Sequence, residues 1–340
     1  MVWFLLSPGH AREYGRIISP FPVYTMDGIA VERPFHAAFN QPEPQFTDWD
    51  GDGWVDMFIN DRDGSVQYFR RFPGLNDSGL PDFRLMNRHF QSMNVGLWFT
   101  FYDFDGDGDQ DILSHTAGTD QVSYWENADS TYLLVTDRLL TDSGDPLYGG
   151  QVVIPTVTDI NDDGFGDYFI GDISGRLTYY QGMGFSDRPS FSFITNQFEG
   201  IQIIWTPARH GANAIDFYDL DDDGDKDLIW GDLYQPGLFY LENFGDNVSP
   251  DFNQDFLVTN FGELAGIQTS GFNIPRLVDL DNDGDGDLVC GTLSGQYGVD
   301  YSRNLIMAQN TGSVNNPIFA YVTSELLVGL DFISESHPVW

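Results

Sequence analysis

The sequence from Asp103 to Asp111 reads Asp-Phe-Asp-Gly-Asp-Gly-Asp-Gln-Asp, and it decides the fold because the pattern occurs five times. Successive copies are separated by 55, 56, 60 and 60 residues. Copies of Asp-x-Asp/Asn-x-Asp-Gly-x-x-Asp begin at Asp48, Asp103, Asp159, Asp219 and Asp279. A motif that returns at nearly constant spacing indicates an array of similar structural units. We therefore interpret most of the chain as repeated units of one kind.

The residues after each motif predict short β-strands. The third motif leads into residues 167–171 and 175–180, and the fourth into residues 227–231 and 237–243. These runs are apolar and aromatic, are bounded by Gly, Pro, Asn and Asp, and show no helical periodicity. Each unit holds about four strands, and a four-stranded sheet repeated radially is a propeller blade. We predict an all-β fold, a β-propeller, in preference to a β-solenoid, whose rungs are shorter.

The number of blades follows less directly from the spacing. At about 57 residues per unit, the 340 residues predict about six blades, five of them with the acidic motif; seven blades or an incomplete propeller are alternatives. The interval from Gly329 to Pro338 repeats that from Gly266 to Pro275, which places a sixth loop aspartate at about position 342. Either the sequence is a fragment of a longer propeller, or residues 12–40 and 324–340 combine into a closing blade.

The N-terminal residues have a different character. Val2 to Leu6 form an apolar block, and Gly9 and Ala11 stand at the small-residue positions of a signal-peptidase site. We expect residues 1–11 to be the remnant of a secretory signal and residues 12–340 to form the propeller; an ordinary hydrophobic first strand is the alternative. No apolar run approaches the ~20 residues that span a bilayer, so we expect no direct membrane insertion.

Composition excludes several classes of protein. With 15 Lys and Arg against 52 Asp and Glu, the net charge is −37, which excludes a nucleic-acid binder that relies on phosphate contacts. The 41% hydrophobic content is too high for a disordered acidic tail. The single cysteine, Cys290, leaves no internal disulfide and no Cys-rich zinc site.

The five motifs are candidate calcium sites. We expect side chains at positions 1, 3, 5 and 9 and the carbonyl of position 7 to bind one ion each, with glycine at position 6 allowing the sharp turn. Crowded hard oxygen ligands suit Ca²⁺ better than Mg²⁺ or Zn²⁺, so we predict about five Ca²⁺ ions. The expected ligands, with the position-7 carbonyl last in each set, are Asp48, Asp50, Asp52, Asp56 and Trp54; Asp103, Asp105, Asp107, Asp111 and Asp109; Asp159, Asn161, Asp163, Asp167 and Phe165; Asp219, Asp221, Asp223, Asp227 and Asp225; and Asp279, Asp281, Asp283, Asp287 and Asp285.

The motifs differ from EF-hand loops at position 12, where an EF-hand needs a bidentate carboxylate. The residues at this position are Ile59, Ser114, Ile170, Trp230 and Cys290. The ninth aspartate instead opens a strand, so each ion is expected in a strand-loop-strand hairpin. Asn161 makes the third loop the least anionic, and we expect it to bind Ca²⁺ most weakly.

Each motif is followed by an apolar pair, in most copies a glycine, and in the third copy a Gly-x-Leu-x-Tyr-Tyr strand. This arrangement resembles the FG-GAP/VCBS repeat family, whose best-known members form the integrin α-subunit propeller. The resemblance covers roughly residues 38–340 and implies calcium-stabilised blades, an extracellular or cell-surface setting, and a role in adhesion or ligand binding. The Phe-Gly and Gly-Ala-Pro block of integrins cannot be recognised in this sequence, and Asn60-Asp61 replace glycine in the first copy.

Catalytic patterns are weak. The six histidines show no ligand spacing, no Gly-x-Ser-x-Gly elbow is present, and carboxylates that bind metal cannot double as a general acid. We therefore expect a secreted or cell-surface calcium-binding adhesion or ligand-binding module, not an enzyme, with a protein or a neutral glycan as its ligand. The alternatives are a lectin or carbohydrate-active enzyme, such as a glycosidase or lyase, on the same scaffold, and a structural repeat of a larger surface assembly.

Aromatic residues fall into two sets. Pairs that recur at one strand position are expected to pack between blades: Tyr68-Phe69, Tyr124-Trp125, Tyr179-Tyr180 and Phe239-Tyr240. Tryptophans outside that register are candidates for sugar-stacking surfaces: Trp49, Trp54, Trp98 and Trp205.

Overall fold

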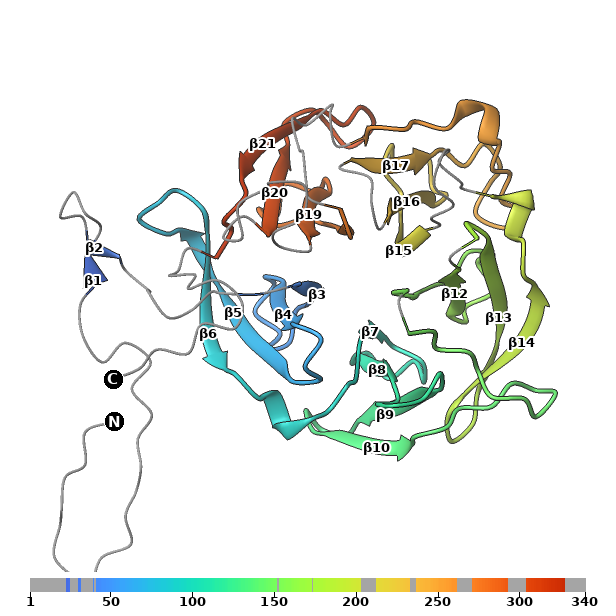
Figure 1. Cartoon of the computed structure of the whole chain (residues 1–340). Coiled ribbons are helices and arrows are strands. Elements are labelled where there is room, and N and C mark those ends of the chain that lie inside the picture. Colours follow the sequence, from blue (N-terminus) through green and yellow to red (C-terminus); the bar gives the residue numbers. More distant parts are fainter. Residues whose placement is uncertain are drawn as a thin grey trace, which may run out of the picture.

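The chain folds into a ring of β-sheets arranged like the blades of a propeller (Figure 1). The computed structural model describes residues 23–24, 30–31, 39, 41–151, 153–172, 174–202, 212–232, 237–261, 271–292 and 304–327. Helical structure in these residues is limited to short turns, among them η1 (Phe90–Ser92), η2 (Phe198–Gly200) and η3 (Gln254–Phe256). The prediction of an all-β propeller is confirmed.

Each blade is an antiparallel meander that runs outward from the centre of the ring. Blade 1 contains β3 (Glu43–Thr47), β4 (Asp56–Asn60), β5 (Val66–Leu75) and β6 (Pro81–Asn87). Blade 2 contains β7 (Phe99–Tyr102), β8 (Asp111–His115), β9 (Val122–Asn127) and β10 (Tyr132–Thr136). Blade 3 contains β11 (Thr156–Thr158), β12 (Asp167–Gly171), β13 (Leu177–Phe185) and β14 (Pro189–Thr195).

The last two blades follow the same plan. Blade 4 contains β15 (Ala212–Tyr218), β16 (Asp227–Asp232) and β17 (Leu238–Leu241). Its outer edge is completed by isolated bridges from Val258 to Tyr240 and from Phe252 to Asn243. Blade 5 contains β18 (Ile274–Val278), β19 (Asp287–Gly291), β20 (Leu305–Asn310) and β21 (Phe319–Thr323). Outside the ring, β1 (Val23–Tyr24) pairs with β2 (Ala30–Val31).

Blade 5 packs directly against blade 1, so the five blades close the ring. Leu280 and Met307 of blade 5 belong to the same buried cluster as Met57 and Phe69 of blade 1. The count of five is close to the expected six. The predicted closing blade falls mainly on residues outside the described part of the chain, as does the predicted signal remnant in residues 1–11.

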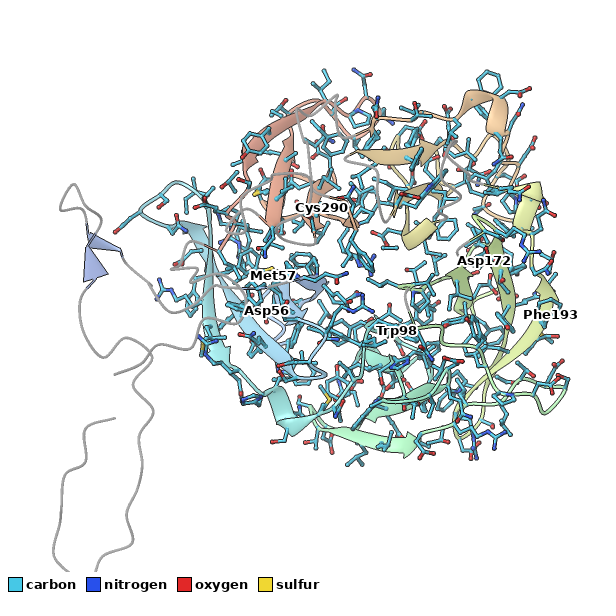
Figure 2. The ribbon with its side chains drawn as sticks, viewed as in Figure 1. Asp56, Met57, Trp98, Asp172, Phe193 and Cys290 are labelled. Carbon is cyan, nitrogen blue, oxygen red and sulfur yellow. The ribbon has the colours of Figure 1, made fainter. Side chains whose placement is uncertain are left out.

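The core lies between neighbouring blades, as the aromatic pattern predicted. Tyr68 is buried and stacks on Phe58 with ring centroids 4.8 Å apart, in a cluster that also holds Phe99 and Ile112 of blade 2. Trp98, a candidate for sugar stacking, is fully buried instead, and its indole Nε1 donates to the carbonyl of Gly149 at 2.7 Å. Figure 2 shows Trp98 inside the ring. Trp205 lies outside the described residues.

In two blades, a neighbouring backbone carbonyl leaves room only for glycine near the end of the second strand. A Cβ at Gly291 would collide with the carbonyl oxygen of Pro42, and one at Gly231 with that of Asn273, because the backbone that enters the next blade passes against them. Asn60 occupies this position in blade 1. Its Nδ2 donates to the carbonyl of Gly96 at 3.1 Å, so the departure from glycine places a hydrogen bond at the same junction.

The innermost strands carry charged side chains that are almost completely buried. Both carboxylate oxygens of Glu43 lack a hydrogen-bond partner in the described part of the chain, and its Oε1 lies 3.7 Å from Nε of Arg62. On β18, Nη1 of Arg276 donates to the carbonyl of Ile215 at 3.1 Å. The same Nη1 lies 3.9 Å from Oδ1 of Asp216. Burial raises the pKa of Glu43 to about 8, although Arg62 and Arg276 oppose the rise.

This shift predicts a pH dependence of stability. Because the folded protein favours protonated Glu43, the stability that Glu43 contributes is complete below its unfolded pKa of 4.5 and is lost as the pH rises towards 8. Glu43→Gln removes this loss. The difference in free energy of unfolding between variant and wild type should therefore shift in favour of the variant between pH 5 and pH 8, by at most about 1.4 kcal/mol per pH unit. Urea unfolding at saturating Ca²⁺ measures it, and Asp77→Asn, an exposed carboxylate, is the control. Parallel pH profiles for Glu43→Gln and wild type would contradict the prediction.

Candidate metal sites

The five acidic loops all connect the first and second strands of a blade, as predicted. We call them loop 1 (48–56), loop 2 (103–111), loop 3 (159–167), loop 4 (219–227) and loop 5 (279–287). The ninth aspartate is the first residue of the second strand in every blade. Because the blades share one topology, all five loops open on the same face of the ring, which we call the metal face.

The side chains at positions 1, 3 and 5 converge. In loops 1, 2, 4 and 5, one carboxylate oxygen from each of these positions lies within 4.8 Å of the others. Loop 3 adopts the same turn with Asn161 at position 3, whose Oδ1 accepts from the amide of Asp163 at 3.1 Å. Twelve of the predicted ligands are therefore brought together in four carboxylate clusters, and loop 3 holds two aspartates and an amide at the equivalent positions.

Glycine at position 6 makes this convergence possible. Its φ lies between +87° and +99° in all five loops, a conformation that other L-residues rarely adopt. In each loop its amide donates to Oδ2 of the aspartate at position 1, for example Gly53 to Asp48 at 2.9 Å and Gly164 to Asp159 at 2.8 Å. The turn thus folds back on its first ligand.

The ninth aspartate is buried and holds the third strand of its blade. Its Oδ1 accepts a backbone N–H at 2.7 to 2.9 Å in every blade; the donors are Arg71, Asn127, Gly182, Asn243 and Asn310. Burial raises the pKa of Asp227 to about 7, a rise that the hydrogen bond from Asn243 opposes. None of the four carboxylate clusters includes the ninth aspartate, and its role as a fifth ligand stays a prediction.

Tyrosine is a second partner of the ninth aspartate, and the sequence patterns did not reveal it. The hydroxyl of Tyr68 donates to Oδ2 of Asp56 at 3.0 Å, and Tyr124 donates to Asp111 at 2.9 Å. Tyr240 repeats the bond to Asp227 at 3.1 Å. The signal in the sequence was the fixed interval of 12 or 13 residues between the ninth aspartate and the tyrosine, which we attributed to packing alone.

Position 7 offers a further oxygen in three loops. Only its backbone carbonyl was expected to bind metal, but Asp109, Asp225 and Asp285 occupy this position in loops 2, 4 and 5, and Oδ1 of each is buried without a hydrogen-bond partner in the described part of the chain. At position 1, Oδ1 of Asp219 and Oδ1 of Asp279 are also buried without a hydrogen-bond partner in the described residues. Buried carboxylate oxygens without donors are costly unless a cation lies among them. The donor set of loops 2, 4 and 5 therefore fits a hard divalent cation.

A pocket of about 400 Å³ lies on the other face of the ring, between blades 1 and 2. Its lining comes from the loops between the second and third strands and from the connections between blades, which lie at the opposite end of the strands from the acidic loops. The polar side chains that line it are Arg62, Asp63, Asn94, His115, Thr119 and Gln151.

Two of the pocket residues are fixed by the protein. Burial lowers the pKa of His115; its Nδ1 accepts from the amide of Leu97 at 3.3 Å, and its Nε2 lies 2.8 Å from the carbonyl of Thr119. Arg62 donates to Gln151 O at 3.0 Å and pairs with Glu43. The exposed polar side chains at the pocket are Asp63, Asn94 and Gln151, and Nε2 of Gln151 donates to Oδ1 of Asp120 at 2.6 Å.

The chain has distant similarities to known proteins. No family model matches the chain. The chain is 25% identical to integrin alpha-V of Gallus gallus over 249 residues, which are 67% of this chain and 23% of the integrin. The chain thus spans about a quarter of that relative. Among solved structures, an Agrocybe aegerita lectin recognising non-reducing terminal N-acetylglucosamine matches with a TM-score of 0.40 and 17% identity, covering 85% of this chain and 68% of the lectin. The V. cholerae biofilm matrix protein Bap1 matches with a TM-score of 0.30 and 14% identity, covering 80% of this chain and 37% of Bap1.

None of the helices in the described ranges is long and apolar enough to cross a bilayer.

The tyrosine contact can be tested on its own. Tyr124→Phe removes the hydroxyl that donates to Asp111 and leaves a buried carboxylate oxygen without that donor. We expect the free energy of unfolding to fall by about 1–2 kcal/mol. Tyr321→Phe, on the exposed outer strand β21, should stay within about 0.5 kcal/mol of wild type. Denaturant unfolding compares them, and equal stability of the two variants would show that the hydrogen bond contributes nothing.

Proposed function

We propose that the chain is a calcium-binding β-propeller of the FG-GAP/VCBS type that works outside the cell or at its surface as an adhesion or ligand-binding module. The observation that carries this proposal is the convergence of three carboxylates in four equivalent loops of the ring. The similarity to integrin alpha-V supports the extracellular setting and the role in adhesion.

The ions would be held by the side chains at positions 1, 3 and 5 of each loop, with the position-7 carbonyl and the ninth aspartate as further ligands. Bound Ca²⁺ supplies positive charge that offsets the repulsion between these carboxylates and so fixes the turn. The chain's own residues prepare the site: glycine at position 6 bends the loop, and the ninth aspartate ties it to the third strand. Binding and positioning, with no catalytic step, are what this arrangement performs.

The ligand class follows from charge and from the pocket. A net charge of −37 would stay strongly negative after five Ca²⁺ ions, so the surface disfavours anionic polysaccharides, nucleic acids and anionic lipids. A basic protein or a neutral glycan meets no such repulsion. The polar pocket between blades 1 and 2 favours a lectin-like variant of this function, because Asp63 and Asn94 offer an acceptor and an amide donor suited to sugar hydroxyls.

Removal of calcium should destabilise the protein. If each site has a Kd of ~10⁻⁴ M, millimolar Ca²⁺ adds roughly 1.4 kcal/mol per site, and five sites add about 7 kcal/mol, comparable to the stability of a whole domain. We expect a clear fall in melting temperature on addition of EDTA, and recovery with excess Ca²⁺. Mg²⁺, which keeps its waters and demands a tighter octahedral cage, should restore less. A melting temperature that EDTA leaves unchanged would refute the calcium proposal.

Salt dependence should separate the two ligand classes. Binding to a basic protein should weaken as salt screens the acidic surface, whereas binding to a neutral glycan should hardly change. A glycan array and a panel of basic proteins, each read at low and high salt, make the measurement. If the pocket binds the ligand, Asn94→Ala should weaken binding at least tenfold, and Asn315→Ala, on the metal face, should not. Tight, salt-sensitive binding to heparin or DNA would contradict the assigned partner class.

A further inference from the structure

One position on the third strand of each blade, or directly after that strand in blade 4, differs from blade to blade, and we call it the facing residue. It is the residue immediately before the backbone N–H that binds the ninth aspartate. The five residues at this position are Arg70, Glu126, Gln181, Glu242 and Gln309. The facing residue is therefore a cation in blade 1, an acid in blades 2 and 4, and a neutral amide in blades 3 and 5.

Contacts of three of these side chains, in blades 1, 3 and 5, reach the loops. Arg70 lies with Nε 2.6 Å from Oδ2 of Asp50 and with Nη2 3.1 Å from Oδ2 of Asp52. Gln181 donates to Oδ2 of Asp163 at 3.0 Å, and Gln309 donates to Oδ2 of Asp281 at 2.7 Å. Each contact is made to position 3 or 5 of the loop.

Loops 1 and 3 also lack the buried oxygens found in the other three loops. Within the described ranges, carboxylate oxygens that are buried and lack a donor occur in loops 2, 4 and 5 but not in loops 1 and 3. Position 7 of loop 1 is Trp54, which adds no carboxylate. An incoming ion would meet four aspartates and one guanidinium at loop 1, against five aspartates and a facing glutamate at loops 2 and 4.

We propose that Arg70 is a built-in counter-ion of loop 1, so that loop 1 binds Ca²⁺ more weakly than each of the other four loops. This inference rests on the proposed calcium binding and concerns the order of the sites. From Asn161 alone, loop 3 would have the lowest affinity for Ca²⁺. We place its affinity above that of loop 1, because Asn161 and Phe165 are neutral, whereas the guanidinium of Arg70 must leave the carboxylates of loop 1 when an ion binds. As free Ca²⁺ falls, loop 1 loses its ion first, and Arg70 then offsets part of the negative charge of that loop.

The test is to exchange the facing residues. Arg70→Gln gives blade 1 the residue found in blades 3 and 5. It should raise the Ca²⁺ affinity of loop 1 roughly tenfold, which is the size expected when a unit charge within hydrogen-bond distance is removed. Gln309→Arg should weaken loop 5 by a similar factor. Arg84→Gln removes a guanidinium that pairs with Asp82 on the outer strand of the same blade and should leave all sites unchanged.

Loop 1 can be read separately because it holds two tryptophans, Trp49 and Trp54. Tb³⁺ bound there should be sensitised by tryptophan excitation, and titration with Ca²⁺ that displaces Tb³⁺ gives the affinity of loop 1. A fall of the signal in Trp54→Phe, which leaves Trp49 in place, assigns it to loop 1. Calorimetric titration with Ca²⁺ counts all sites in wild type, Arg70→Gln and Gln309→Arg. Melting curves at saturating Ca²⁺ establish that each variant is folded.

The outcomes separate this inference from the proposed function. A tighter loop 1 in Arg70→Gln together with a weaker site in Gln309→Arg supports the role of the facing residue. Equal loop 1 affinity in wild type and Arg70→Gln, with the other sites binding normally, overturns the inference and leaves calcium binding intact. Absence of Ca²⁺ binding at every site overturns both.

Discussion

The buried aspartate at the ninth position of each acidic loop is the contact on which the other features depend. It opens the second strand, accepts a backbone N–H from the third strand, and closes the loop that bends back to its first ligand. A buried carboxylate is costly unless it is hydrogen-bonded, so the register of second and third strands is fixed wherever this residue stands. In blades 3, 4 and 5 its Oδ2 also accepts the amide of position 2, for example that of Leu220, which anchors the start of the loop.

The ring itself depends on close approach between neighbouring blades. The backbone entering each blade runs against the second strand of the preceding blade, and Gly231 and Gly291 leave room for it. The metal face adds polar links between neighbours: Nδ2 of Asn282 in loop 5 donates to the carbonyl of Gly53 in loop 1 at 2.9 Å, and Asn315 of blade 5 reaches loop 4. Loop geometry and ring closure are therefore coupled, because the same turns that gather carboxylates also touch the next blade.

The sequence was sufficient to predict the main repeated features, but not the tyrosine that binds the ninth aspartate in three blades. The period of the acidic motif predicted the blades, the ninth aspartate predicted where the second strand begins, and paired aromatics predicted the packing between blades. The five blades in the described residues are close to the predicted number, about six, which came from dividing the length of the chain by the repeat. The expected ligands converge at positions 1, 3 and 5, since these lie within one turn of the chain.

Features that are unique to one blade escaped prediction because they depend on residues distant in sequence. Trp98 was a candidate for sugar binding until the structure placed its indole against Gly149 of the next connection. The buried charges Glu43 and Arg276 come from opposite ends of the described chain and meet only because the ring closes. Arg70 lies 18 residues beyond Asp52, and nothing in the loop itself indicates that a cation faces it.

The two faces of the ring are under different constraints, which is why binding is better placed on the pocket face. On the metal face every acidic loop has nine residues and the same turn, because the ninth aspartate, the glycine and the converging carboxylates leave no freedom in length. The separation of the second and third strands varies, from five residues between β4 and β5 to thirteen between β19 and β20. Loops that vary in length on a rigid scaffold are the usual carriers of recognition. Ions that stabilise one face would therefore hold the blades in place while the other face changes to suit its ligand.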